Sequence, residues 1–383
     1  MIKIAAGFIL GILFVVAGLF GLAHTAPKPH VEVVTATDVE PSTPSAPTAA
    51  PQTETPVAKS QTTPTTTPKA PAAATSSTGT LSGVHVYTDA ELLTMADNKY
   101  ADGNVPLGDY KYVTSAPKKG YIYLCNVHKD NPGSMVNGPW MGSDTWNFLQ
   151  KISIQGSISW PNAVFSNTIS GAYRTLAGND LPINHTTGVF PVSSNDPAAS
   201  YDKNPNTISA QSLSQKLPTD PIYSSTPYCM GGEVGVMLSG VALFNGFDAG
   251  LRDAAAHELQ DSCEGHPQGS GEYHYHSLSS CFKDIEQTAV LGFAYDGYPI
   301  TGPKVAENKY LTTEDLDECH GLTSEIVVDG KKKTTYHYVM TQDFPYSASC
   351  FRAKPVTTGP SAGAPAGGGQ MGQQGMMPPP PPR

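Results

Sequence analysis

The stretch that decides the fold covers residues 257–281 and reads HELQDSCEGHPQGSGEYHYHSLSSC. At its centre is the tetrapeptide Tyr273-His274-Tyr275-His276. Because alternate side chains of an extended strand share one face, His274 and His276 point to one side and the two tyrosines to the other. The two histidine Cβ atoms then lie roughly 6–7 Å apart, so that both imidazoles can bind one metal ion. The pattern predicts a strand with a pair of metal ligands on one face.

A third histidine and two cysteines surround this strand. His266 stands eight residues before His274, across a Gly-rich segment that can fold back. A disulfide between Cys263 and Cys281 would hold the ends of that loop. Three imidazoles suit zinc or copper and can activate a bound water, so we predict a copper or zinc ion on His266, His274 and His276. The alternative is that these histidines are structural and donate to backbone carbonyls.

The features of this region recur further along the chain. Residues 241–282 are matched in order by residues 293–351. Both segments contain an apolar run before Asn-Gly or Asp-Gly, then Asp-x-Cys-x-Gly, then Tyr-His-Tyr, then Ser-Cys-Phe. Such an ordered set of matches indicates an internal duplication. We therefore expect a domain of two related halves.

The N-terminus predicts export. One lysine precedes an apolar run over residues 4–23, which ends in Gly21-Leu22-Ala23. The small-x-small ending is typical of a cleaved signal peptide, whereas an apolar run of about 20 residues is long enough to span a bilayer. We predict that residues 1–23 are a signal peptide or a membrane anchor, and either one exports the rest of the chain. The expected location is periplasmic, cell-surface or secreted.

Composition separates a folded domain from two flanking segments. Residues 24–80 and 354–383 are rich in Pro, Thr, Ala and Gly and poor in large apolar side chains, which predicts a disordered stalk and a disordered tail. The folded domain is expected over residues 81–353. A net charge of −10 without basic runs argues against nucleic acid as a partner. The chain points to no particular surface or envelope partner.

The cysteines predict a disulfide framework. Six cysteines in an exported chain suggest three disulfides. Cysteines at equivalent positions of the two repeats should form equivalent disulfides, one within each repeat. The two cysteines outside the repeats are then left to form the third disulfide. The predicted bridges are Cys263–Cys281, Cys319–Cys350 and Cys125–Cys229. The alternative is that some of these cysteines are free or bind metal.

Periodicity indicates a mainly β fold with short helices. Alternating or continuous apolar runs predict strands over residues 120–127, 151–160, 163–174 and 232–243. A capping-box motif predicts a helix over residues 88–96, and Asp248 is expected to cap a second helix that ends near Leu259. Residues 176–228 read as a long ordered loop. We expect a disulfide-stabilised β sandwich or barrel-like domain.

Other titratable residues accompany the histidine cluster. Glu258, Glu264 and Glu272 are candidates for a catalytic base or for partners of the ligands, although exposed carboxylates are common without either role. His185 lies in the long loop and reads as a surface histidine. The tyrosines of the strand, with Tyr295, read as core-facing aromatics.

The second repeat offers two further histidines. His337 and His320 are candidates for an additional metal ligand or for a hydrogen-bond donor to one. Val339 stands where the first repeat has His276, so we expect no second complete triad.

These motifs resemble the YHYH-domain family. The resemblance rests on DSCEGHPQGSGEYHYHSLSSC, GFAYDGYPITGP, DLDECHG and YHYVMTQDFPYSASCF, and it covers roughly residues 120–352. It implies an exported protein and no particular activity. Members often carry histidine where this chain has Leu322, Ser324 and Val339, so the resemblance implies that the second histidine cluster is reduced here.

Two functions are consistent with the sequence. The first is an extracytoplasmic metal-binding protein, which as an enzyme would perform metal-assisted hydrolysis or oxidation with a glutamate base. The second is a non-catalytic surface module for adhesion or ligand binding, whose histidines are structural. A groove lined by Trp140, Trp146 and Trp160 would favour the module, whereas a buried, convergent histidine triad would favour the metal site.

Overall fold

The computed structural model describes residues 83–127, 133–134 and 137–356. The predicted signal peptide or anchor, the stalk and the tail beyond residue 356 lie outside these ranges. Within them, no helix is long and apolar enough to cross a membrane.

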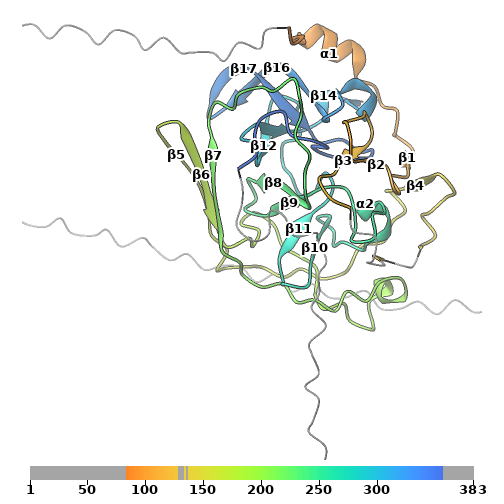
Figure 1. Ribbon diagram of the computed structural model, residues 1–383. Coiled ribbons are helices and arrows are strands. Elements are labelled where there is room, and N and C mark those ends of the chain that lie inside the picture. Colours follow the sequence, from red (N-terminus) through yellow and green to blue (C-terminus); the bar gives the residue numbers. More distant parts are fainter. Residues whose placement is uncertain (1–82, 128–132, 135–136, 357–383) are drawn as a thin grey trace, which may run out of the picture. The chain divides into compact units, whose positions relative to one another are not determined.

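An eight-stranded mixed sheet forms the centre of the fold (Figure 1). Its strands are, in sheet order, β10 (Gly265–Pro267), β11 (Tyr273–Tyr275), β9 (Ala242–Phe244), β8 (Glu233–Met237), β12 (Val290–Ala294), β13 (Pro299–Thr301), β17 (Lys331–Val339) and β16 (Gly321–Val328). The first four strands in this order come from the first repeat and the last four from the second. The two halves meet at β8 and β12, which pair antiparallel.

The pairings of the first half recur in the second. β8 pairs antiparallel with β9, β9 parallel with β11, and β11 antiparallel with β10. β12, β13, β17 and β16 repeat this scheme. Even the register shift recurs, between Glu233 and Gly235 in one half and between Val290 and Gly292 in the other. The predicted duplication is confirmed. The first half begins at β8, one strand before the motif match, whereas the second half begins at β12, the strand that contains Phe293.

Smaller elements surround this sheet. A three-stranded antiparallel sheet and three two-stranded sheets account for the other strands. They are β5 (Phe165–Ser170), β6 (Tyr173–Gly178) and β7 (Leu213–Pro218), then β1 (Asn104–Pro106) with β4 (Thr145–Asn147), β2 (Tyr112–Val113) with β3 (Ile122–Tyr123), and β14 (Lys304–Ala306) with β15 (Lys309–Tyr310). The helices are α1 (Asp89–Met95), α2 (Ala254–His257), and the 3-10 turns η1 (Pro197–Ser200) and η2 (Thr313–Asp315).

Several predicted strands take a different form. The strand expected over residues 120–127 shortens to β3, and residues 151–160 form only isolated bridges, at Ile154 and Ile158. These bridges join Asp261 and Thr187, which lie in loops, so no ladder can extend. The strand expected over residues 163–174 is the hairpin β5–β6, and the predicted loop over residues 176–228 contains β7 and η1.

One helix prediction is correct and the other is too long. Thr88 and Glu91 form the predicted capping box of α1. Asp248 does not cap a helix, because its Oδ1 accepts from the N–H groups of Gly250 and Arg252 and closes a turn. The helix therefore starts later, and α2 is capped by Asp253, whose carboxylate accepts from the N–H of Ala256.

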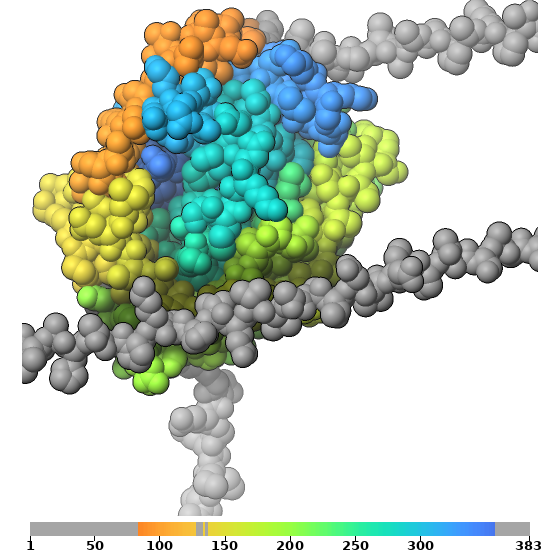
Figure 2. Space-filling model, turned by 180° about the vertical axis from the view of Figure 1, so that it is seen from behind, coloured from red at the N-terminus to blue at the C-terminus, as the bar shows by residue number. Residues whose placement is uncertain are grey.

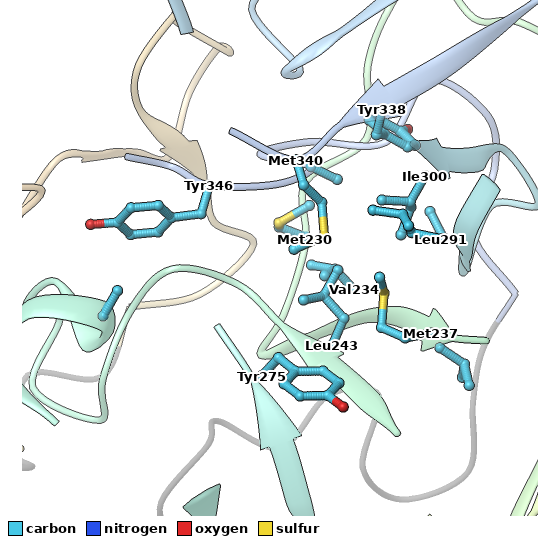
Figure 3. Close-up of a cluster of buried hydrophobic side chains, with 14 of the residues drawn as sticks. Met230, Val234, Met237, Leu243, Tyr275, Leu291, Ile300, Tyr338, Met340 and Tyr346 are labelled. Atoms are coloured by element: carbon cyan, nitrogen blue, oxygen red, sulfur yellow. The ribbon is translucent and has the colours of Figure 1, made fainter. Parts of the chain in front are cut away.

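Apolar side chains from both halves form one core beneath the centre of the sheet (Figure 3). Val234 and Leu243 of the first half pack with Leu291 and Ile300 of the second. The tyrosines predicted to face the core do so, since Tyr273, Tyr275 and Tyr295 are buried. The structure also contains the three predicted disulfides, Cys263–Cys281, Cys319–Cys350 and Cys125–Cys229.

Candidate metal centre

Three histidines converge at the β10 end of the central sheet. His266 on β10 lies directly opposite His274 on β11, and His276 follows β11. Their ligand nitrogens lie within 4.8 Å of one another, and all three residues are buried. The Nε2 atoms of His274 and His276 are 3.0 Å apart. The sheet register and the period of the strand thus bring the predicted triad together.

Backbone carbonyls orient two of the imidazoles. Nδ1–H of His274 donates to the carbonyl of Glu272 at 3.1 Å, and Nδ1–H of His276 donates to the carbonyl of Asn245 at 2.6 Å. A neutral imidazole that donates from Nδ1 carries its lone pair on Nε2. Two lone pairs therefore face each other over 3.0 Å. A cation bound by both nitrogens would remove this repulsion, and carbonyl contacts of this kind are typical of metal-bound histidines.

A carboxylate occupies another side of the cluster. Oε2 of Glu258 lies 3.4 Å from Nε2 of His266 and 3.4 Å from Nε2 of His276. Within the described ranges, this oxygen and both ring nitrogens of His266 are buried without a hydrogen-bond partner. Because buried polar atoms nearly always have partners, the unpaired Oε2 of Glu258 and the facing Nε2 of His266 are suitably placed to bind a cation.

Burial makes the metal-free cluster neutral. Desolvation raises the pKa of Glu258 well above its usual range, and the nearby Asp248 raises it further. Desolvation also lowers the pKa of His276 to about 4, and the pKa values of His266 and His274 well below their usual range. At neutral pH the imidazoles are therefore unprotonated, which is the form that binds metal.

Neighbouring side chains fix the ligands in place. Phe244 on β9 stacks on His274 with 4.1 Å between the ring centroids. Glu258 directly follows α2, and Lys151 holds this end of the helix. The Lys151 ammonium donates to the carbonyls of Ala255 and Glu258 and to the side chain of Gln260. Burial lowers the pKa of Lys151 to about 8.

Residues 214–313 match the family model described as YHYH protein. This match places residues 214–313 in the YHYH family. The matched segment begins at β7 and ends at η2, so it contains all of the first half of the central sheet and the three histidines. No curated protein and no solved structure matches the chain.

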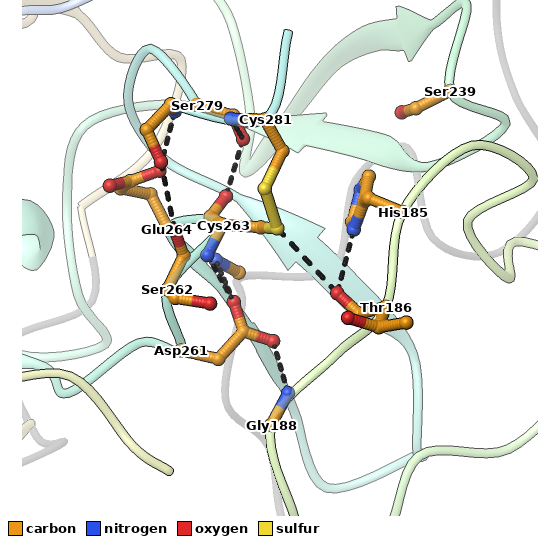
Figure 4. The surroundings of a disulfide bond; sticks show 12 residues. His185, Thr186, Gly188, Ser239, Asp261, Ser262, Cys263, Glu264, Ser279 and Cys281 are labelled. Carbon is orange, nitrogen blue, oxygen red and sulfur yellow. Dashed lines mark hydrogen bonds between the residues drawn. A yellow bond between two sulfur atoms is a disulfide. The ribbon is translucent and has the colours of Figure 1, made fainter. Parts of the chain in front are cut away.

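In the YHYH domain, the Asp-x-Cys-x-Gly motif forms a turn in which Asp261 contacts Cys263 and Gly188 (Figure 4). The Asp261 carboxylate accepts from the N–H groups of Cys263 and Gly188 and from the hydroxyl of Tyr273. The bond to Tyr273 ties the turn to β11, the strand of His274. The Cys263–Cys281 disulfide lies beside this turn.

The second half of the domain repeats this turn. The Asp317 carboxylate accepts from the N–H groups of Cys319 and Gly321 and from the hydroxyl of Tyr336. His320 and Glu264 occupy the same place in the two turns, and both have left-handed backbone angles, with φ of 69° and 58°. The motif is therefore structural in both halves.

The second half does not repeat the histidine triad. Leu322 lies opposite His337, in the register where the first half has His266 opposite His274. Leu322 and Val339 belong to a separate apolar cluster that also contains Leu92 of α1. From behind, the orange segment with α1 lies against the light-blue part of the second half (Figure 2).

The structure places His337 and His320 away from the triad, each with its own partners. Nδ1 of His337 contacts the hydroxyl of Thr301, and Nε2 contacts the Ser324 hydroxyl at 2.9 Å. Nε2 of His320 contacts the hydroxyl of Thr341 at 3.0 Å. Burial lowers the pKa values of both histidines to about 3. Neither histidine joins the triad, and each has hydroxyl partners of its own.

The other two predicted carboxylates have different surroundings from Glu258. Oε2 of Glu264 accepts from the N–H of Ser280, and Glu264 lines a cavity of about 300 Å³. The side chain of Glu272 pairs with Gln268. Desolvation raises the pKa values of Glu264 and Glu272 to about 7.

His185 is not the surface histidine that the sequence suggested. It is partly buried, and its Nε2 accepts from the hydroxyl of Tyr275 at 2.5 Å. Its Nδ1–H donates to the carbonyl of Thr186. It also lies near the sulfurs of Cys263 and Cys281, but a disulfide lacks the thiolates that bind metal. No local pattern links His185 to Tyr275, so this contact could not be predicted from sequence.

Proposed function

We propose that this YHYH domain is an extracytoplasmic metal-binding domain that holds one zinc or copper ion on His266, His274 and His276. The observation that carries the proposal is the pair of Nε2 atoms 3.0 Å apart, each on a ring whose Nδ1 donates to a carbonyl. Imidazole is a common ligand of both metals. A metal-dependent envelope enzyme would in addition need an open coordination position.

The disulfides support an extracytoplasmic location. All six cysteines are paired, and disulfides persist in oxidising compartments. We propose that the protein is periplasmic, cell-surface or secreted, and that residues 1–23 direct its export.

The tryptophans give the surface-module alternative no support. Trp140 and Trp146 are buried, and their indole N–H groups donate to the carbonyl of Ala256 and the hydroxyl of Tyr346. Trp160 is half-buried and donates to the hydroxyl of Thr187. Side chains in these positions support the core, so we favour the metal-binding function.

The experiment is metal analysis by plasma mass spectrometry. The full-length protein is purified without a His tag from an oxidising compartment, then incubated with zinc or copper and dialysed. We expect about one ion per chain in the wild type and its loss in His274→Ala and His276→Ala. The matched control is His337→Ala, which changes the equivalent histidine of the second half and should keep the ion. A wild type that binds neither metal, or histidine variants that keep theirs, would refute the proposal.

A further inference from the structure

We infer that Glu258 is a fourth metal ligand and not a catalytic base, so that the centre is closed by protein atoms and retains its ion. This inference rests on the proposed function, because Glu258 needs the metal as its partner. On this inference the bound ion has a structural or storage role, and the domain is not a metal-dependent hydrolase.

The distances from Glu258 suit a ligand. In a tetrahedral site with metal–ligand bonds of about 2.0–2.2 Å, two ligand atoms lie roughly 3.3–3.5 Å apart. Oε2 of Glu258 lies 3.4 Å from both His266 Nε2 and His276 Nε2. A base acting on a metal-bound water lies one hydrogen bond of about 2.6–3.2 Å beyond that water, and hence further from the imidazole nitrogens. The spacing therefore places the carboxylate among the ligands.

The surroundings of Glu258 also suit a ligand. Its N–H donates to the carbonyl of Ala254, and its own carbonyl accepts from Lys151, so its backbone is held at the end of α2. Its Oε2 is buried and has no hydrogen-bond partner. A buried carboxylate oxygen on a fixed backbone, aimed at imidazole nitrogens, lacks only a cation.

The neighbouring cavity does not open onto the four ligands. This cavity of about 300 Å³ is the natural candidate for a substrate pocket, and Lys151, Gln260, Glu264 and Ser277 are among its lining residues. Neither Glu258 nor any of the three histidines lines it. The histidines are also nearly inaccessible, with side-chain exposures of 6% for His266 and 3% for His276. A molecule bound in this cavity would be separated from the ion.

The ligand set favours zinc over copper. Three imidazole nitrogens and one carboxylate oxygen are ligands of tetrahedral zinc. Copper(I) prefers soft thiolate and thioether ligands, and copper(II) prefers tetragonal geometry. We therefore assign the closed centre to zinc.

The test uses the full-length protein and Co²⁺, which gives zinc sites a visible spectrum. Four-coordinate Co²⁺ absorbs strongly and higher-coordinate Co²⁺ weakly. We expect strong absorption in the wild type that added azide does not change, because no position is open. In Glu258→Ala we expect the affinities for Co²⁺ and Zn²⁺ to fall by roughly 10–100-fold. We also expect added azide or formate to change the Co²⁺ spectrum of this variant, because either anion can enter the vacated position.

Two further variants complete the design. Glu258→Gln preserves side-chain size and should also lose affinity, which separates ligation from packing. Glu264→Gln changes a half-buried carboxylate of the adjacent cavity and should match the wild type.

The outcomes separate the two proposals. Wild-type affinity and spectrum in both Glu258 variants would overturn the inference while leaving the histidine site intact. A spectral change when azide is added to the wild type would overturn it as well, and needs no variant to fold. No Co²⁺ or Zn²⁺ binding by the wild type would instead refute the proposed function itself.

Discussion

At the scale of single residues, the proposed metal centre depends on groups other than its proposed ligands. The carbonyls of Glu272 and Asn245 set which ring nitrogen of His274 and His276 faces the cluster. Lys151 holds Glu258 in position, because its ammonium donates to the carbonyls of Ala255 and Glu258 and to the side chain of Gln260 at the end of α2. A buried ammonium with its donors satisfied stabilises the fold, whereas its removal leaves the acceptors buried without partners.

Lys151→Met should therefore lower both stability and metal affinity. The carbonyls of Ala255 and Glu258 would lose a charged donor, which we expect to cost roughly 2–4 kcal/mol in the free energy of unfolding. Denaturant unfolding of the metal-free protein measures the first effect, and zinc competition titration measures the second. Lys332→Met is the control, since Lys332 is 75% exposed and its loss should leave stability nearly unchanged. Equal effects of the two substitutions would contradict this role of Lys151.

At the scale of elements, the antiparallel pair β10–β11 carries the site. The pair holds His266 opposite His274, and the Cys263–Cys281 disulfide joins the segments on either side of it. The equivalent pair β16–β17 has the equivalent disulfide, Cys319–Cys350, but no histidine triad. Each disulfide thus closes the loop around its strand pair, and only the first flanks a histidine triad.

Removal of each disulfide should separate these tasks. The bridged cysteines are 18 residues apart for Cys263–Cys281 and 31 for Cys319–Cys350. On the chain-entropy model, replacing either pair by alanine costs about 3–4 kcal/mol of unfolding free energy. Zinc titration should show weaker binding only for the variant that lacks Cys263–Cys281. Equal zinc affinities in the two folded variants would show that this disulfide does not help to organise the site.

Local sequence patterns predicted some elements better than others. The capping box of α1 and the two-residue period of Tyr273–Tyr275 are complete within a few residues, and both predictions are confirmed. Residues 151–160 alternate as a strand does, but their partners Asp261 and Thr187 lie in loops, which no local pattern reveals. The contact of Glu258 with the histidines likewise depends on how α2 packs beside β10 and β11. Pairing across a long stretch of chain is decided by the whole fold.

At the scale of the whole molecule, one duplicated frame has two different interiors. The motifs predicted the duplication because their order and spacing survive, and the sheet order mirrors it. In the first half the frame encloses the three histidines of the triad. In the second half, Leu322 and Val339 pack with Leu92 of α1, and His337 is held by hydroxyl groups. The second half has no triad because Leu322 and Val339 stand at two of the three equivalent positions and pack in an apolar cluster.

The buried His337 of the second half should make stability depend on pH. Burial lowers the pKa of His337 to about 3, whereas an unfolded histidine titrates near about 6.5. Between these values only the unfolded chain binds the proton, so this contribution to stability is complete above about pH 6.5 and is lost as the pH falls toward about 3. His337→Gln removes it and preserves hydrogen-bonding groups.

Unfolding free energies of the metal-free wild type and His337→Gln measure this effect. Between about pH 6 and pH 4, the wild type should lose about 1.4 kcal/mol more per pH unit than the variant. Parallel pH profiles would show that His337 is not held neutral by the fold.

The most direct test of the metal centre is anomalous X-ray diffraction from crystals of the zinc-loaded protein, with data on both sides of the zinc absorption edge. We predict a single anomalous peak among the Nε2 atoms of His266, His274 and His276, at about 2.0–2.1 Å from each. The absence of a peak at this position, or a zinc ion held by other residues while the triad stays empty, would contradict the assignment.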